Sequence, residues 1–213
     1  MREDCWYKEV CTRDTCDACI RFLEMSYLMD NSGIPKKRQM PISLTAGVDI
    51  KAFEYLADIK DDIEQWVKDG ENLYICSECT GNGKTSWAIK LLLKYFDCIW
   101  AGNGFRIRGY FVNVPSLLST LKDFSNEKLS QLKNILLNAD VVVWDDIASS
   151  KLSDYDIGQL LIYIDHRNLQ ELANIYTGNI VTNENLIECV GSRLASRIWQ
   201  HSDIVQFKGK DRR

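Results

Sequence analysis

The stretch Gly81-Asn82-Gly83-Lys84-Thr85-Ser86 decides the fold. It lies between an apolar run typical of a strand, which ends at Cys76, and an apolar run typical of a helix, which begins at Trp87. A strand that leads into a helix through a glycine-rich turn ending in Gly-Lys-Thr is typical of a phosphate-binding loop. The glycines let the backbone approach an anion closely, and the N-terminus of the helix favours negative charge there.

Individual side chains of this loop have separate expected roles. Lys84 would reach the outer phosphates of a nucleotide, and the hydroxyl of Thr85 could coordinate Mg²⁺. The loop departs from the full motif at one position, where Glu78 replaces the first glycine. The residues that we expect to contact the nucleotide are Thr80, Gly81, Asn82, Gly83, Lys84, Thr85 and Ser86.

A second strand is predicted by the apolar, β-branched run from Asp140 to Trp144, which ends on the carboxylates Asp145 and Asp146. Such a run is typical of a central parallel strand buried on both faces. Ligands of open α/β sheets bind outside the carboxyl ends of the strands, so both carboxylates would face the phosphate loop. We expect Asp145 to hold Mg²⁺ together with Thr85, and Asp146 to orient or deprotonate an attacking water. The two segments together indicate a nucleoside triphosphatase core.

Two later segments add candidate residues. A third short strand ends at Asn179, whose amide could hydrogen-bond the γ-phosphate or the attacking water; the alternative is a turn asparagine that follows a glycine. Arg193 and Arg197 are four residues apart and would share one face of a helix. They could act on the γ-phosphate held by a neighbouring subunit, or they could form a solvated or ion-paired helix face.

The chain of 213 residues is 46% hydrophobic and 26% charged, which suits one α/β domain and a small appendage. The alternation of the segments predicts a five-stranded parallel sheet with helices on both faces, with Asp49 capping the second helix and Ser153 or Asp154 capping the sixth. Expected strands cover about 72–77, 110–114, 140–145, 174–178 and 203–208. Expected helices lie near 16–30, 49–69, 84–96, 115–122, 127–138, 154–170 and 184–200.

Charge and hydropathy limit the classes of function. The net charge of −4 argues against wholesale binding of polyanions and leaves room for local basic patches. No apolar run approaches 18 residues and the N-terminus has no signal pattern, so we expect a cytoplasmic protein without a membrane span. Basic and aromatic residues that could contact DNA are Trp100, Asn103, Phe105, Arg106, Arg108, Lys122, Phe124, Lys128 and Lys133.

Four of the eight cysteines lie within the first 19 residues. They are Cys5, Cys11, Cys16 and Cys19. The spacing of the last two allows both thiolates to bind one tetrahedral zinc, so we expect a structural Zn²⁺ site, with free reduced thiols as the alternative. We therefore divide the chain into a Cys-rich N-terminal module over residues 1–32, a linker over 33–48 and an ATPase domain over 49–213.

The order of the motifs GNGKTS, VVVWDDI, IYTGN, GSRLASRI and IVQFKGKDRR resembles the bacterial replicative helicase loaders of the DnaC/DnaI type. These are AAA+ ATPases of the P-loop class, related to the IstB transposition ATPases. The resemblance covers roughly residues 33–213, and the short chain suggests a phage or mobile-element version. After Arg197 there is room for one strand, so we expect no C-terminal helical lid.

This resemblance implies a role for each motif. Lys84 and Thr85 match the phosphate-loop pair, Asp145 and Asp146 the Walker B pair, and Asn179 the first sensor. Arg193 matches the arginine finger with Arg197 close behind, and Arg212 matches the second sensor. The implied ligands and partners are ATP, Mg²⁺, single-stranded DNA, a DnaB-type hexameric helicase and further copies of the chain. Many AAA+ relatives carry glutamate at the position of Asp146, and the shorter side chain favours slow hydrolysis.

Three other functions stay open from the sequence. The chain could be a transposition ATPase that polymerises on duplex DNA, or a nucleotide-switched adaptor with little turnover. It could also be a small-molecule kinase, which is the weakest alternative because Asn179 and the paired arginines have no role in that reaction.

Overall fold

The computed structural model describes residues 5, 7, 9, 11, 12, 19–39, 43–99, 105–122 and 127–211. Five strands form one sheet in the order β2-β3-β4-β1-β5, and every neighbouring pair is parallel. The strands are β1 (Asn72–Cys76), β2 (Gly109–Asn113), β3 (Val141–Asp145), β4 (Ala173–Gly178) and β5 (Asp203–Gln206). The predicted five-stranded parallel sheet is therefore confirmed.

Helices connect the strands. They are α1 (Ile20–Asp30), the short 3₁₀ helix η1 (Lys36–Arg38), α2 (Ile50–Asp61), α3 (Ile63–Lys68), α4 (Lys84–Ile99), α5 (Val114–Leu121), α6 (Glu127–Asn138), α7 (Asp154–Leu169) and α8 (Asn183–Trp199). No helix in the described part of the chain is both long enough and apolar enough to cross a membrane.

The segment predicted as one helix over 49–69 is two helices. The backbone leaves helical geometry at Asp62 (φ −113°, ψ 26°), where α2 ends and α3 begins. Both pieces pack against α4, and the break lets each keep its apolar side chains in that contact. Asp49 stands at the start of α2, but its side chain makes no capping bond. Ser153 does cap α7 as predicted, because its hydroxyl accepts from the Asp156 amide.

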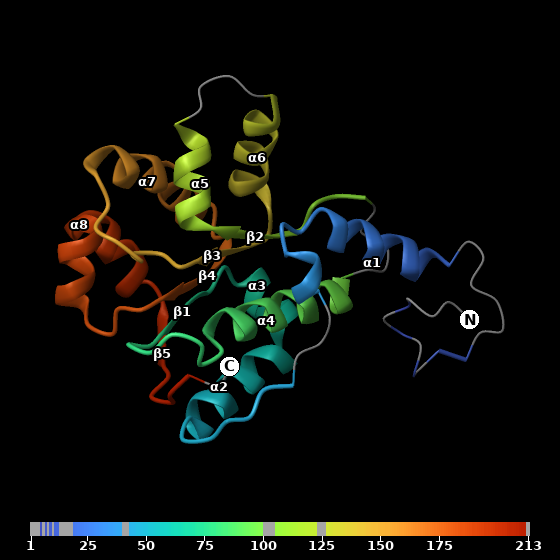
Figure 1. Cartoon of the computed structure of the whole chain (residues 1–213). Helices are drawn as coiled ribbons and strands as arrows, with labels where there is room; N and C mark the ends of the chain where they lie inside the picture. Colours follow the sequence, from blue (N-terminus) through green and yellow to red (C-terminus); the bar gives the residue numbers. More distant parts are fainter. Residues whose placement is uncertain are drawn as a thin grey trace.

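Helices cover both faces of the sheet (Figure 1). Successive residues of a strand point to opposite faces, so Leu73 and Ile75 of β1 pack with α1 to α4. Tyr74 and Cys76 of the same strand pack with α5 to α8 on the other face. All residues of β1, β3 and β4 are buried, and for β3 this confirms the predicted central strand buried on both faces.

Helix α1 belongs to the core of this domain. Its residues Met25, Leu28 and Met29 are buried in the same apolar cluster as the inner face of α4. The chain that follows α1 is tied to β2, because the Phe111 amide donates to the Ser32 carbonyl oxygen at 2.6 Å. Gly33 fits this close approach with φ +71°, and a Cβ there would lie 2.2 Å from the Phe111 oxygen. Residues 20–34 therefore pack as part of the same domain as the sheet.

A buried arginine holds the amino ends of β3 and β4. Arg167 of α7 donates to the carbonyl oxygens of Leu136, Ala139 and Ala173 at 3.1, 2.7 and 2.5 Å. Its Nε donates to the Asn174 side chain at 2.7 Å, and that same oxygen accepts from the Trp144 indole at 3.0 Å. Burial lowers the pKa of Arg167 to about 10. This network fixes α7 and the turn before β3 to the sheet.

We expect Arg167→Met to lower the free energy of unfolding by about 3 kcal/mol or more, because several buried carbonyl oxygens each lose a donor at about 1–3 kcal/mol. Urea denaturation measures this loss. Arg106→Ala is the matched control, since Arg106 makes an exposed ion pair with Asp140 that is worth about 1 kcal/mol or less. Equal stability of the two variants would show that the buried network does not stabilise the fold.

Candidate functional site

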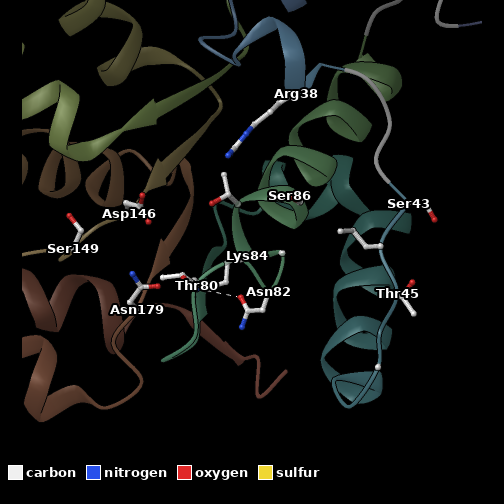
Figure 2. Close-up of a pocket in the computed structure, with 15 residues that line it drawn as sticks. Arg38, Ser43, Thr45, Thr80, Asn82, Lys84, Ser86, Asp146, Ser149 and Asn179 are labelled. Atoms are coloured by element: carbon white, nitrogen blue, oxygen red, sulfur yellow. Dashed lines mark hydrogen bonds between the residues drawn. The ribbon is translucent and has the colours of Figure 1, made fainter. Parts of the chain in front are cut away.

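A cavity of about 840 Å³ opens at the carboxyl ends of the central strands (Figure 2). The phosphate loop forms its floor, Asp146 and Asn179 lie on one side, and residues 43–47 lie on the other. Its lining residues are Arg38, Ser43, Leu44, Thr45, Gly47, Thr80, Gly81, Asn82, Gly83, Lys84, Thr85, Ser86, Asp146, Ser149 and Asn179. The structure therefore brings residues of three separate motifs together at one cavity, and Asp145, which does not line it, is hydrogen-bonded to the lining residue Thr85.

The phosphate loop uses its two glycines for left-handed backbone conformations. Gly81 has φ +70° and Gly83 has φ +104°, values that favour glycine, and Lys84 then begins α4. Glu78, at the position where the motif has a glycine, has an exposed side chain and is absent from the residues with positive φ among those the structure describes. A side chain at that position therefore causes no backbone strain in this loop.

Asn82 connects the loop to the C-terminal segment. Its side-chain amide is buried and donates to the Ser77 hydroxyl at 2.5 Å and to the Gly209 carbonyl oxygen at 3.2 Å. The amide of Gly209 in turn donates to the Asp49 carboxylate, as does the amide of Lys208 at 2.6 Å. The carboxylate predicted to cap α2 thus holds residues 208–209 against the loop instead.

Lys84 lies within the loop with its ammonium group directed along it. The Nζ atom donates to the Cys79 carbonyl oxygen at 2.8 Å and to the Asn82 side-chain oxygen at 3.4 Å. Burial lowers the pKa of Lys84, and the negative charge of Asp146 opposes that effect. A desolvated cation held only by neutral oxygens favours an anionic ligand, because a phosphate would satisfy the charge better.

Asp145 joins three elements through two short hydrogen bonds. Its Oδ1 accepts from the Thr85 hydroxyl of α4 at 2.7 Å and from the Thr177 hydroxyl of β4 at 2.8 Å. The carboxylate is 5% exposed, so these bonds satisfy a charge that water hardly reaches. Carboxylate and hydroxyl oxygens are the ligands that Mg²⁺ prefers, and the Asp145–Thr85 pair fits that ion.

Asp146 follows in a strained conformation at the edge of the cavity. Its φ of +58° is uncommon for a residue other than glycine, and its amide donates to the Thr177 hydroxyl at 3.1 Å. Burial raises the pKa of Asp146, and the neighbouring charge of Asp145 raises it further. Both effects make this carboxylate a stronger base than an exposed aspartate, which suits a group that accepts a proton from water.

Asn179 reaches the cavity from the end of β4, next to Asp146 (Figure 2). The preceding Gly178 is required by close packing, since a Cβ there would lie 2.5 Å from the Tyr74 hydroxyl and 3.0 Å from the Ile147 carbonyl oxygen. The side-chain amide of Asn179 can donate into the same volume that Lys84 and Asp146 border.

Arg193 and Arg197 lie outside this cavity. Both belong to the part of α8 that follows a kink at Gly191 (φ +75°), and both donate to Asp165 of α7 at 2.7 Å. Partial burial acts to raise the pKa of Asp165. The hydrogen bonds from Arg197 and Arg193 outweigh this effect, so the pKa is lowered overall. The side chain of Arg193 is 68% exposed, so it remains accessible to another molecule. Arg212 lies outside the described residues.

No protein-family model and no curated protein matches the sequence. Solved structures do match the fold. The crystal structure of the DnaC helicase loader aligns with a TM-score of 0.67 at 21% identity, over 82% of this chain and 100% of that chain. DnaI aligns with a TM-score of 0.65 at 17% identity, over 83% of this chain and 95% of that chain. The chain has the fold of the DnaC-type helicase loaders.

Two further structures extend this likeness. A putative primosome component from Streptococcus pyogenes serotype M3 aligns with a TM-score of 0.65 at 18% identity, over 88% of this chain and 98% of that chain. The replication initiator DnaA bound to AMPPCP and single-stranded DNA aligns with a TM-score of 0.60 at 13% identity, over 80% of this chain and 49% of that chain. The fold is thus shared with about half of a replication initiator that was solved with AMPPCP and single-stranded DNA.

The cysteines and the basic residues proposed for DNA lie away from the cavity or outside the described residues. Cys5, Cys11 and Cys19 are free thiols, Cys16 is not described, and the described residues contain no group of three or more His, Cys, Asp or Glu side chains placed to hold a metal. The four-cysteine zinc site stays a prediction. Among the remaining candidates, Trp100, Asn103, Phe124 and the side chain of Lys128 lie outside the described residues.

Arg106 and Arg108, two of the candidates for DNA contact, bind Asp140. Asp140 directly precedes β3, at the amino ends of the strands and therefore at the opposite edge of the sheet from the cavity. Lys122 pairs with Asp156 of α7 at 3.2 Å. Contact of these residues with DNA stays a prediction.

Sequence reasoning missed several residues of the site. The segment 33–48, which was expected to be a linker, supplies Arg38, Ser43, Leu44, Thr45 and Gly47 to the cavity wall. Thr177, which orients both Asp145 and Asp146, could have been found as a hydroxyl residue near the end of the strand that leads to Asn179. No local sequence pattern indicates that Arg38 lies at the cavity, because its position depends on the packing of the turn against the end of α1.

We expect Thr177→Val in this DnaC-type fold to lower the free energy of unfolding by about 1–3 kcal/mol, because buried Asp145 loses a donor and the Asp146 amide loses its acceptor. Thr177→Ser is the matched control: it keeps the hydroxyl and loses a methyl group, which costs about 0.8 kcal/mol. Urea denaturation of both variants measures the difference. If serine destabilised the protein as much as valine, the hydroxyl would not be what holds the two carboxylates.

Proposed function

We propose that this protein binds ATP with Mg²⁺ in the cavity and hydrolyses it to ADP and phosphate. The arrangement of Lys84, the Thr85–Asp145 pair, Asp146 and Asn179 around one cavity carries this proposal. Loop amides and the Lys84 ammonium bind the phosphates, since both are donors directed at the same volume. The loop residues Thr80 to Ser86 and the opposite wall at residues 43–47 then hold the nucleotide between them.

Each of these side chains would have a separate role in the hydrolysis. Mg²⁺ held by Thr85 and Asp145 would supply positive charge to the phosphate oxygens during the reaction. Asp146 accepts a proton from the water that attacks the γ-phosphorus, while the bond between that phosphorus and the bridging oxygen of ADP breaks. Asn179 donates from its amide to the γ-phosphate or to the attacking water. Asp146 is one methylene shorter than glutamate, which favours a slow reaction.

We further propose that Arg193 completes the site of a neighbouring subunit, with Arg197 beside it. Two features support this role. Arg193 does not line the cavity of its own chain, and its guanidinium is largely exposed beside Asp165. A guanidinium offered across a subunit boundary would stabilise charge on the transferred phosphoryl group, so hydrolysis would depend on ATP-dependent self-assembly.

The cellular role that we propose is the loading of a DnaB-type hexameric helicase onto single-stranded DNA during replication. The fold of the DnaC helicase loader, of DnaI and of a primosome component supports this role, as does that of DnaA bound to single-stranded DNA. ATP binding and hydrolysis would then act as a switch that controls when the helicase is released.

Arg193→Ala should bind ATP with near-normal affinity and hydrolyse it about 10³-fold more slowly, because the lost guanidinium acts on a neighbour's transition state. Lys84→Ala should lose ATP binding and hydrolysis together. Mixing the two inactive variants should restore part of the rate, since one supplies an intact cavity and the other an intact Arg193. Arg106→Ala, at the opposite edge of the sheet, is the control. Absence of rescue would mean that each chain works alone.

The helicase role is tested with the DnaB-type hexameric helicase encoded in the same genome. We expect the two proteins to co-elute in size-exclusion chromatography with ATP and single-stranded DNA, and the complex to be lost with Lys84→Ala. If the protein does not bind the helicase and instead forms filaments on duplex DNA, it is a transposition ATPase of the IstB kind and the loader role is wrong.

A further inference from the structure

Arg38 directs an unpaired positive charge into the phosphate cavity. It is the last residue of η1 and lines the cavity, and its guanidinium points towards Ser86 and the space in front of Asp146 (Figure 2). All three residues of this turn, Lys36, Lys37 and Arg38, are exposed, but the two lysines do not line the cavity. Of these three cations, Arg38 is the one that faces the cavity.

The backbone that carries Arg38 is anchored on both sides. The Gln39 side-chain amide donates to the carbonyl oxygens of Met29 and Ile34 at 3.0 and 3.1 Å, which ties the turn to the end of α1. The Arg38 amide donates to the Pro35 oxygen at 2.7 Å, and the Ser32 oxygen accepts from Phe111 of β2. A guanidinium on a fixed backbone loses less conformational entropy when it binds a ligand.

Arg38 also stands apart from the other arginines. Among the arginines of the described ranges, it is the one that makes no hydrogen bond or ion pair with any described residue. The others each bind a carboxylate or backbone oxygens: Arg21, Arg106, Arg108, Arg167, Arg193 and Arg197. A guanidinium has five donors in a planar fork that matches phosphate oxygens, so a phosphate in the cavity would satisfy it.

The charges around the cavity indicate which phosphate of a bound nucleotide Arg38 would contact. Burial is the main effect on the pKa of Asp146 and raises it, whereas the positive charges of Lys84 and Arg38 both act in the opposite direction. Both cations are therefore within electrostatic reach of the carboxylate proposed to activate water. The volume shared by Lys84, Arg38 and Asp146 is where the phosphate attacked by that water must lie.

We propose that Arg38 binds the terminal phosphate of the nucleoside triphosphate held by its own chain, so that η1 and the end of α1 respond to the presence of that phosphate. This inference rests on the proposed function, because it assumes that the cavity binds ATP. Arg38 is a ligand from within the chain, distinct from Arg193, which acts on a neighbour. When hydrolysis removes the terminal phosphate, Arg38 loses its partner and the anchored turn is released from the nucleotide.

The test compares the affinities of AMPPCP and ADP, each with Mg²⁺, by isothermal titration calorimetry. Arg38→Ala should weaken AMPPCP binding by about 10- to 100-fold, the effect expected for a charged hydrogen bond, and change ADP binding by less than about 2-fold. Arg38→Lys keeps a point charge without the fork and should give an intermediate loss for AMPPCP. The matched control is Lys37→Ala, which removes a cation from the same turn and should leave both affinities within about 2-fold.

A second measurement compares the wild-type protein with Arg38→Ala. Hydrogen exchange of residues 32–39 in the wild-type protein should be slower with AMPPCP than with ADP, and this difference should vanish in Arg38→Ala. The inference is overturned if Arg38→Ala binds AMPPCP as tightly as Lys37→Ala does, or if it weakens AMPPCP and ADP equally. A wild-type protein that binds neither nucleotide would overturn the proposed function itself, whereas tight AMPPCP binding by Arg38→Ala overturns only the role of Arg38.

Discussion

The carboxylate of Asp145 accepts hydrogen bonds from two threonine hydroxyls that belong to different elements, Thr85 in the first turn of α4 and Thr177 in β4. A buried carboxylate must be satisfied in this way, so the end of β3 fixes the distance to both neighbours. Because α4 begins at the phosphate loop, this fixes the loop as well. The same Thr177 hydroxyl accepts from the Asp146 amide, and so one small group of bonds sets the relative position of every motif at the cavity.

Patterns within single segments predicted much of the fold. The apolar runs that end at Cys76 and Asp145 indicate buried parallel strands, and alternation with helices then leads to a parallel sheet with two covered faces. The phosphate loop could be predicted because its function requires glycines and a lysine at fixed spacing. The kink at Gly191 and the break at Asp62 escaped prediction, since both depend on how the helices pack and the helical periodicity continues across them.

Features of the site that depend on distant segments could not be predicted in this way. Arg38 reaches the cavity because Ser32 pairs with β2 and Gln39 binds the end of α1, and neither contact has a local sequence signature. Arg167 is a charged residue in the last turn of α7, where a position on the surface would be expected, but it is completely buried. Both positions are set by tertiary packing, which overrides the local tendency of a charged residue to face water.

The contact between Asn82 and Gly209 has a consequence for the synthesis of the protein. The Asn82 amide of the phosphate loop donates a hydrogen bond to the carbonyl oxygen of Gly209, 127 positions later in the chain, and the Asp49 carboxylate accepts from the Lys208 amide across 159 positions. During translation the strands β1, β3 and β4 leave the ribosome before Gly209 does. The loop therefore lacks part of its support until that residue has emerged, and a nascent chain completes its phosphate loop only after β5 and the segment that follows it have been made.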